Sequence, residues 1–353
     1  MPRQLTENQK GEIEFRKKLY FQQVEGKAVL EDEFDAAGIE KILEGRMKRT
    51  LDQMTTLRQR GVGLSPYIEI GAERCQRSLV MQNDLCADGA AVDISYDLLR
   101  SCNHYAEVFS RPKPPVRICC DANNLPFRTS SIPFVFCYET LHHFPEPTPI
   151  TEEIYRVLLP GGCFFFDEEP YKQVLHINLY KGRKIYSGDS LNRSTTRRVL
   201  DRFFCAPSCN EAEHGIIENH HISVKSWKQA LARFEEKDID LNAASRYRIL
   251  QSKLFSPTSY MRYFAAYLLG GTVSGVAKKR GNTARPSSSI YDALICPSCR
   301  QTGSEVLLHQ RDSSFLCAEC SRTYPVINEV VFLFSYDKFE ELYPEIFNLC
   351  QKQ

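Results

Sequence analysis

The chain has 353 residues, of which 42% are hydrophobic and 25% are charged, and its formal net charge at pH 7 is +1. This length predicts about two domains, and the composition is that of an ordinary soluble globular protein. The near-neutral balance argues against nucleic-acid binding through overall charge, and no stretch has the roughly 18 consecutive apolar residues of a membrane span.

The charges are unevenly distributed along the chain. Residues 171–290 carry 20 Lys and Arg against 9 Asp and Glu, a net charge of +11, which leaves −10 for the remainder. This basic region could meet an anionic partner such as RNA, a nucleotide sugar or a lipid phosphate. A solvated helical face explains the same residues, so both interpretations stay open.

Fourteen cysteines would indicate disulfides in a small secreted chain, but this chain is long and its first twenty residues lack the apolar segment of a signal peptide. Most of the ten cysteines outside a C-terminal cluster lie in or beside apolar segments, as Cys119 and Cys137 do. Buried free thiols in a reducing compartment explain them most simply, so we expect a cytoplasmic protein.

Residues 1–66 are charged and compatible with helices. Apolar side chains such as Ile39, Leu43 and Met47 recur at steps of three and four residues, which predicts amphipathic helices. We expect a helical extension that packs on the next domain or covers a substrate pocket as a lid.

Short apolar strands that end in acidic residues follow this extension. The predicted strands are, in chain order, 67–70 before the turn at Gly71, 90–94 with Asp93, 116–120 before Asp121, 134–138 before Glu139, and 163–167 after the turn at 159–162. Strands of this kind with helices between them form an open, doubly wound parallel sheet, and ligands bind at its carboxyl edge. The pattern predicts that Glu69, Asp93 and Asp121 lie along that edge.

Prolines and caps predict the elements around the fourth strand and beyond. We expect loops at five prolines: Pro126, Pro133, Pro145, Pro147 and Pro149. Residues 151–158 predict the helix before the fifth strand. Residues 227–234 predict a further helix, and residues 236–241 and 272–278 predict the sixth and seventh strands, so the domain would end near residue 280.

The ordered motifs IEIGAER, AVDIS, CCDANNLPF, VFCYETLHHFPEP and EIYRVLLPGG resemble the class I S-adenosylmethionine-dependent methyltransferases, in particular the broad small-molecule branch. The resemblance covers residues 67–170. It implies an α/β fold with a Rossmann-like, seven-stranded doubly wound sheet over residues 67–280, in which residues 171–221 form a basic insertion over the strand ends.

The resemblance also implies a site for S-adenosylmethionine. The residues that it places around the cofactor, from the methionine end to the ribose and the adenine, are Glu69, Gly71, Asp93, Ile94, Asp121, Ala122 and Tyr138. Two residues depart from the family pattern, because Glu73 and Cys75 stand where glycines are usual. A glutamate there adds bulk and negative charge near the cofactor carboxylate, which favours the alternative of a non-catalytic, methyltransferase-like binding or scaffold protein.

Methyl transfer requires mainly that the two reactants be held in line. A general base is needed only when the acceptor is a hydroxyl or a protonated amine. The candidate bases follow the fourth strand and are Glu139, His142 and His143, with Glu168 and Glu169 as further acids after the fifth strand. A structural role for the paired histidines stays open.

A linker, residues 281–290, precedes four cysteines in two knuckles. Cys296 and Cys299 form the first CxxC motif, and Cys317 and Cys320 form the second after seventeen residues. Four thiolates at this spacing predict a tetrahedral zinc site. A module of this size has a small core, so we expect the metal to supply much of its stability.

Residues 323–334 (TYPVINEVVFLF) resemble the small zinc-binding activator protein that partners several tRNA, ribosomal RNA and release-factor methyltransferases. The resemblance implies that residues 291–353 form a zinc-ribbon-like domain and that the activator is carried in the same chain.

Together these patterns predict an S-adenosylmethionine-dependent methyltransferase fused to a zinc-binding domain. A small molecule or a glycan precursor is the favoured acceptor, and RNA is the alternative. No Asn-Pro-Pro-Tyr motif, which marks many enzymes that methylate the amino groups of bases and glutamine, follows the fourth strand, and this argues against those substrates. A third hypothesis is an RNA-binding module that uses Arg193, Arg197 and Arg198. The sequence does not predict the oligomeric state.

Overall fold

The computed structural model describes residues 2–25, 36–171, 180–183, 196, 205–208, 222–243, 271–282 and 289–351. Most of the predicted basic insertion, with Arg193, Arg197 and Arg198, lies outside these residues, as do parts of the basic region 171–290. No helix in the described part of the chain combines the length and apolar character that crossing a membrane requires.

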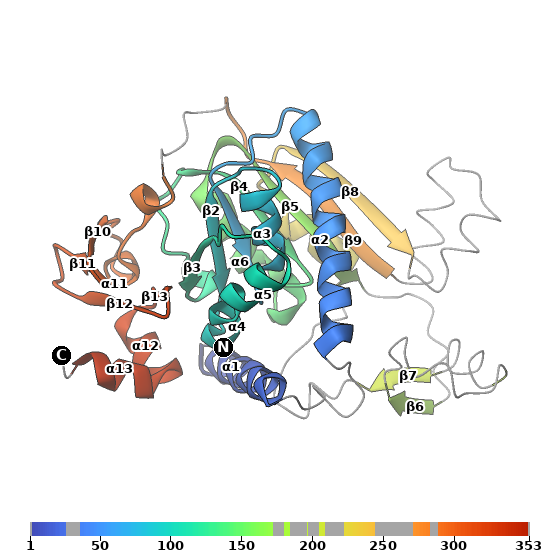
Figure 1. Cartoon of the computed structure of the whole chain (residues 1–353). Coiled ribbons are helices and arrows are strands. Elements are labelled where there is room, and N and C mark those ends of the chain that lie inside the picture. Colours follow the sequence, from blue (N-terminus) through green and yellow to red (C-terminus); the bar gives the residue numbers. More distant parts are fainter. Residues whose placement is uncertain are drawn as a thin grey trace.

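Seven strands within the described residues form a twisted sheet in the order β3-β2-β1-β4-β5-β9-β8 (Figure 1). The first five are parallel to one another, and β9 is antiparallel to both β5 and β8. The strands are β1 (Tyr67–Ile70), β2 (Gly89–Asp93), β3 (Val116–Cys119), β4 (Ile132–Tyr138), β5 (Leu158–Tyr171), β8 (Glu236–Ala243) and β9 (Gly271–Lys278). The predicted Rossmann-like sheet is therefore confirmed.

The central strands are apolar on both faces because helices cover both sides of the sheet. Every residue of β4 is buried, as expected for a strand in the middle of a parallel sheet. One face packs against α2 (Ala36–Gln59), α3 (Gln76–Asn83) and α5 (Cys102–Val108), and the other against α6 (Pro147–Val157) and α8 (Val224–Ala230). The short helix α4 (Tyr96–Arg100) follows β2.

Three of the predicted proline loops are wrong. Pro147 is the first residue of α6 and Pro149 lies in its first turn. Proline is tolerated there because the first turn of a helix leaves its N–H groups without intrahelical partners. Pro133 also lies inside β4, where the pairing with β5 shifts register between Ile132 and Phe134. Pro126 and Pro145 lie in loops as expected.

The other local predictions differ from the structure by a few residues. The helix predicted at 227–234 begins earlier, at Val224, because Ser223 caps it by accepting a hydrogen bond from the Ser226 N–H. The turn predicted at residues 159–162 is part of the long strand β5. The strands β6 (Tyr180–Arg183) and β7 (Cys205–Ser208) form a separate parallel pair.

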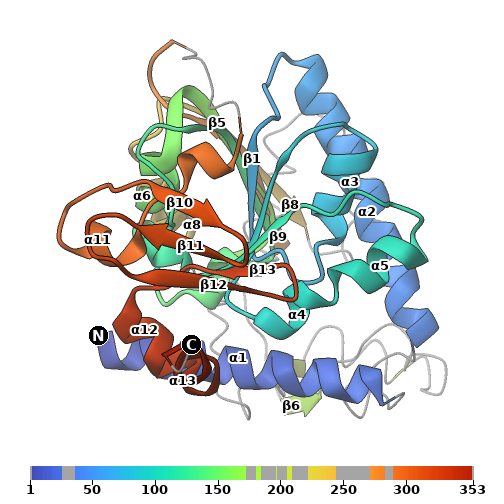
Figure 2. The ribbon, with the colours of Figure 1, turned by 60° about the vertical axis from the view of Figure 1, so that its left-hand side comes forward.

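The C-terminal residues extend the same sheet beyond β3. Strand β13 (Val330–Phe332) pairs in parallel with β3, and the order continues outward through β12, β11 and β10 (Figure 2). The remaining elements are η5 (Tyr291–Ala293), α11 (Pro297–Gln301), β10 (Leu308–Arg311), β11 (Ser314–Cys317), β12 (Thr323–Ile327), α12 (Tyr336–Leu342) and α13 (Pro344–Gln351). We refer to residues 289–351 as the C-terminal module.

Aromatic side chains pack between this module and the parallel sheet. Phe332 is fully buried, and its ring centroid lies 5.1 Å from that of Tyr96 on α4 and 5.4 Å from that of Phe339 on α12. Arg117 of β3 also forms an ion pair with Glu329 at the start of β13. The two sequence-distant segments therefore share one core.

The long helix α1 (Pro2–Val24) lies across the carboxyl ends of the strands, where α12 and α13 lie beside it (Figure 2). Lys338 of α12 donates to Thr6 Oγ1 and, over 3.1 Å, to Gln9 Oε1. α2 stands in front of the sheet in Figure 1. The N-terminal extension thus contacts both the parallel sheet and the C-terminal module.

Phe332→Ala should lower the free energy of unfolding by roughly 3 to 5 kcal/mol, because it removes a buried ring and leaves a cavity. Urea unfolding followed by circular dichroism would measure this change as a lower midpoint of one shared transition. Leu349→Ala, at a position that is 64% exposed, is the control and should change the stability by less than about 0.5 kcal/mol. A variant in which only a minor fraction of the signal shifts, while the main transition keeps its midpoint, would argue against a shared core.

Candidate functional site

A cavity opens at the carboxyl ends of β1, β2, β3 and β4. Side chains from the strand ends and from α1 line it, and the residues are Asn8, Gln9, Glu12, Arg16, Ile70, Gly71, Glu73, Val92, Asp93, Ile94, Cys120, Asp121, Ala122, Tyr138, Glu139, Thr140, His143 and Phe144. Six of the seven residues predicted to hold the cofactor are among them, and Glu69 is not. The parallel sheet brings these six together because its strand ends share one edge.

The turn after β1 has a left-handed backbone at three alternate residues. The φ angles are +69° at Gly71, +48° at Glu73 and +61° at Cys75. Position 71 requires a residue without a Cβ, because a Cβ on Gly71 would lie 2.2 Å from Thr140 Oγ1. Glu73 and Cys75 therefore keep the backbone conformation that glycine favours, although each carries a side chain.

Two arginines from the N-terminal helices compensate the charge of Glu73. Arg46 Nη1 donates to Glu73 Oε2 over 2.8 Å, and Arg16 Nη1 lies 3.9 Å from Glu73 Oε1. Burial opposes the charge of Glu73, but these arginines outweigh it and hold the pKa of the carboxyl well below its usual range. The extra negative charge that the sequence places at this turn is thus paired within the protein.

Asp93 is anchored by backbone groups on both sides of the cavity. Its Oδ2 accepts from the Glu73 N–H and its Oδ1 from the Ser95 N–H, each over 2.8 Å. Burial raises the pKa of Asp93 to about 6, while these two hydrogen bonds act in the opposite direction. The carboxylate therefore ties the turn after β1 to the loop after β2.

Asp121 caps the short 3-10 helix η1 (Ala122–Asn124) at the end of β3. Its Oδ1 accepts from the Asn123 N–H over 2.9 Å, and its side chain lines the cavity next to Ala122. Phe144 lines the same cavity from the loop after β4. An acid, a small residue and a ring are thus among the groups that line the cavity.

Glu69 lies away from the cavity, on the side of α3. It is 1% exposed, and its Oε2 accepts from Ser78 Oγ over 2.5 Å. Burial raises the pKa of Glu69 to about 8, although the Arg77 charge and the Ser78 hydroxyl oppose this shift. A protonated, enclosed carboxyl does not offer a charge to a ligand in the cavity at neutral pH.

Two of the three candidate bases face the cavity. Glu139, with φ +48°, and His143 line it, and Arg46 Nη2 donates to Glu139 Oε2 over 3.1 Å. His142 is instead buried, with its Nδ1 3.0 Å from Glu169 Oε2. The Glu169 carboxylate also accepts from the N–H groups of residues 140, 141 and 142, so this pair shapes the loop after β4.

α2 presents a polar stripe to the ends of β4 and β5. Arg49 Nη2 lies 2.9 Å from Asp167 Oδ2, Gln53 Nε2 donates to the same oxygen over 2.6 Å, and Arg49 also pairs with Glu168. Gln53 Oε1 accepts from the Tyr138 hydroxyl over 2.8 Å. These contacts join α2 to the strand ends beside Tyr138, which lines the cavity.

The contributions of Arg16, Arg46 and Gln9 were not predicted from the sequence. A signal was present, because Glu12 and Arg16 are four residues apart, and Arg46, Arg49 and Gln53 lie at steps of three and four, as expected for one helix face. That spacing shows which side chains share a face but not which strand ends they meet.

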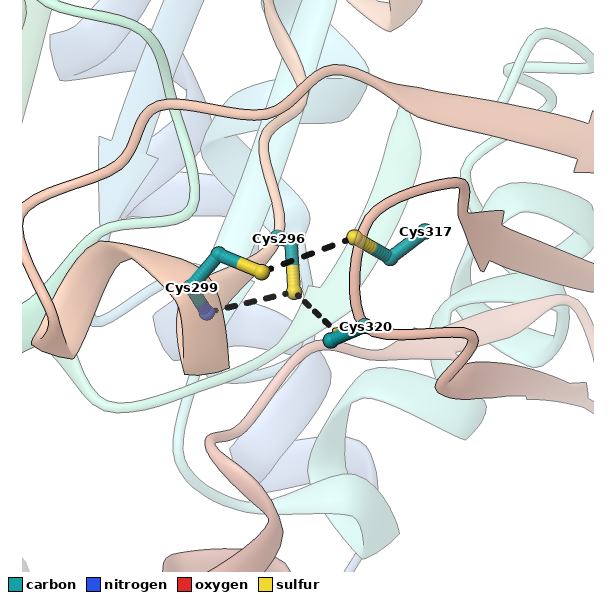
Figure 3. Close-up of side chains that lie close together, drawn as sticks. All are labelled: Cys296, Cys299, Cys317 and Cys320. Atoms are coloured by element: carbon teal, nitrogen blue, oxygen red, sulfur yellow. Dashed lines mark hydrogen bonds between the residues drawn. The ribbon is translucent and has the colours of Figure 1, made fainter.

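The four predicted cysteine ligands converge in the C-terminal module (Figure 3). Their sulfur atoms lie within 4.8 Å of one another, with 3.6 Å between Cys296 and Cys320 and between Cys299 and Cys317. Tetrahedral coordination with zinc–sulfur bonds of about 2.3 Å separates the sulfurs by roughly 3.8 Å, whereas a disulfide would need about 2.0 Å. The arrangement fits a four-thiolate metal site.

The C-terminal module also touches the loops that form the cavity. The buried Tyr343 hydroxyl donates to the Ile94 carbonyl over 2.6 Å and accepts from the Tyr96 N–H over 3.0 Å. Arg300 donates to Asn124 in η1. Both contacts lie next to acids of the cavity, at the loops after β2 and β3.

Part of the chain that forms the parallel sheet is similar to a known protein family. Residues 68–166 match a family model described as a methyltransferase domain. The family match and the observed strand order of the sheet are consistent with each other. They support a class I methyltransferase.

Two curated relatives are uncharacterized chloroplastic methyltransferases of Arabidopsis thaliana. One is 31% identical over 121 residues, which cover 32% of this chain and 34% of the relative. The other is 34% identical over 77 residues, which cover 21% of this chain and 22% of the relative. The chain thus spans about a third of the length of the first relative and about a fifth of the second.

Solved structures with this likeness include a complex of the Trm112 methyltransferase activator with a methyltransferase from Haloferax volcanii. It has 18% identity and a TM-score of 0.39, and the match covers 70% of this chain and 96% of that chain. Geranyl diphosphate C-methyltransferase from Streptomyces coelicolor A3(2) has 12% identity and a TM-score of 0.42, with 68% and 83% covered.

Glu69→Gln should change how stability depends on pH. Because the pKa of Glu69 is about 8 in the folded protein against 4.5 ordinarily, the folded state binds more protons between these values, and stability falls as pH rises through this window. Because glutamine does not titrate, the variant does not lose stability in this way. Its stability relative to the wild type should therefore increase from about pH 5 to about pH 8. Urea unfolding at several pH values would measure the difference.

The control for this experiment is Glu107→Gln, which removes an exposed carboxyl on α5. Its pH profile should follow that of the wild type. Parallel profiles for Glu69→Gln and the wild type would contradict a protonated Glu69.

Proposed function

We propose that this chain is an S-adenosylmethionine-dependent methyltransferase with a built-in zinc module. The observation that carries the proposal is the convergence of Gly71, Asp93 and Asp121 on one cavity at the carboxyl ends of three adjacent parallel strands. Binding of an adenosine-containing ligand at this edge is what such sheets support.

Five of the cavity residues have roles that suit this cofactor. The Asp93 carboxylate would accept hydrogen bonds from the ribose hydroxyls, because each of its oxygens can accept a second bond besides the backbone one. The Asp121 side chain would accept from the adenine amino group, and Ala122 and Phe144 would flank the ring. Tyr138 would lie beside the sulfonium end of the cavity.

The acceptor would enter on the side of Glu139 and His143. The reaction transfers the methyl group from sulfur to the acceptor nucleophile, so alignment supplies most of the rate enhancement. If the acceptor carries a proton to be lost, Glu139 or His143 would remove it, because both line the cavity. His142 would only position the loop through Glu169.

The charge of the cavity favours a neutral or cationic acceptor group. The carboxylates of the cavity outnumber its cations, because Arg16 lines it and Arg46 pairs with two of the acids from outside. The five carboxylates are those of Glu12, Glu73, Asp93, Asp121 and Glu139. A phosphate-rich acceptor would meet repulsion there. We therefore favour a small molecule or a glycan precursor over RNA as the acceptor.

The zinc module would act as a support for the cofactor site. Zinc bound by Cys296, Cys299, Cys317 and Cys320 would fix the fold of a module with a small core. That module in turn holds the loops after β2 and β3 through Tyr343 and Arg300. The support arises within one chain, so no separate activator is required.

The non-catalytic alternative depended on Glu73 and Cys75. Both residues have the left-handed backbone expected of the glycine pattern, and the carboxylate of Glu73 is paired with Arg46. Neither feature now favours a scaffold over an enzyme.

Asp93→Ala should weaken S-adenosylmethionine binding at least tenfold, because the ribose loses a charged hydrogen-bond acceptor and the turn after β1 loses its anchor. Calorimetric titration of purified, zinc-replete protein would measure the dissociation constants. The control is Asp84→Ala, which removes a carboxylate that pairs with Arg111 outside the cavity and should leave binding unchanged. Failure of the folded wild type to bind the cofactor would refute the proposed function.

Cys317→Ser should remove about one zinc per chain, lower the melting temperature by roughly 10 °C and weaken cofactor binding several-fold. Mass spectrometry of the metal content, calorimetry and cofactor titration would measure the three effects. Cys350→Ser changes a half-buried thiol outside the cluster and should keep zinc and affinity. Cofactor affinity that survives zinc loss would remove the supporting role of the module.

A further inference from the structure

Arg16 is the cation that α1 brings into the cavity. Its Nε donates to Glu12 Oε1 over 2.6 Å, and its Nη1 lies 3.9 Å from Glu73 Oε1, too far for a hydrogen bond. Its Nη atoms make no hydrogen bond among the described residues. The side chain is 16% exposed, so the guanidinium is largely enclosed and holds unused donors near the turn after β1.

Arg46, the arginine that α2 brings to this turn, is already engaged. Its two Nη atoms donate to Glu73 over 2.8 Å and to Glu139 over 3.1 Å. It bridges the turn after β1 and the end of β4. Arg16 is therefore better placed than Arg46 to accept a new anionic partner.

A ligand with an amino-acid end matches the groups around Arg16. The cofactor of the proposed function carries a carboxylate and an ammonium group on the same carbon. A guanidinium between two carboxylates, those of Glu12 and Glu73, offers the opposite charge to each group within one site. Glu69, which the family resemblance placed at this end, is enclosed behind Ser78 and offers no charge there.

We propose that Arg16 binds the carboxylate of the amino-acid end of S-adenosylmethionine, with Glu12 accepting from its ammonium group. This inference rests on the proposed function. It assigns the recognition of one end of the cofactor to a helix outside the segment 68–166 that matches the methyltransferase family. Arg16 would be a specificity-determining residue for ligands with an amino-acid end.

The position of α1 is fixed well enough for this role. Lys338 of the C-terminal module donates to Gln9 Oε1, and Gln9 itself lines the cavity. On the far side of Arg16, Gln23 Nε2 donates to the Tyr105 hydroxyl of α5. Contacts on both sides of Arg16 therefore hold the helix over the cavity.

The test compares two ligands that differ only at the amino-acid end. S-adenosylhomocysteine has the carboxylate and ammonium groups, and 5′-methylthioadenosine keeps the adenosine and the thioether without them. Calorimetric titration of the zinc-replete full chain would give both dissociation constants for the wild type, Arg16→Met and Arg16→Lys. Lys18→Met, at an exposed position of the same helix, is the matched control for the loss of one charge.

We expect Arg16→Met to weaken S-adenosylhomocysteine binding at least tenfold and 5′-methylthioadenosine binding less than twofold, with Arg16→Lys in between and Lys18→Met unchanged. An equal loss for both ligands would overturn the proposal, because Arg16 would then act only through the placement of α1. Unchanged binding of both ligands would overturn it as well. A folded wild type that binds neither ligand would refute the proposed function itself, an outcome distinct from the other two.

Discussion

The parallel pairing of β13 with β3 is the interaction on which the arrangement of the chain depends. It joins residues more than two hundred positions apart in one ladder, Val330 beside Arg117 and Phe332 beside Cys119. Without it, β3 would be the edge of the parallel sheet, with backbone groups open to another strand. With it, the helices that follow β13 come to lie beside the loop after β2, where Tyr343 contacts Ile94 next to Asp93 of the cavity.

The cavity is consequently assembled from three parts of the chain. The strand ends provide the acids Asp93 and Asp121, α1 provides Arg16 and Gln9, and the C-terminal module supports both. Charge pairing also joins these parts, because Glu73 of the turn after β1 meets arginines of α1 and α2. A glutamate in place of a glycine is unusual in this turn. Its pairing with Arg16 and Arg46, on helices that precede the turn in the chain, explains how its charge is accommodated.

Local patterns predicted the parallel sheet well, because each strand is short and apolar, ends at or near an acid and is bounded by turn residues. They also predicted the four thiolates, since the CxxC spacing specifies a geometry by itself. The predictions from local patterns were wrong where the same residue type suits two different structural roles. Pro147 can break a helix or begin one, and the choice depends on where α6 starts. Glu69 shares the sequence context of a ligand-binding acid, yet its side chain points to Ser78, which only the packing of α3 determines. The roles of Arg16 and Arg46 depend on contacts across the fold, which helical periodicity does not encode.

The contact between Lys338 and Gln9 has a consequence for how the molecule is made. It joins side chains 329 positions apart, so it cannot form until nearly all of the residues between them have left the ribosome. The parallel strands can pair earlier, because β1 to β5 lie close together in the chain and domains generally fold as they emerge. The growing chain would therefore lack this contact between α1 and the C-terminal module for most of its synthesis. The contacts that hold α1 over the cavity are complete only when the C-terminal module has formed.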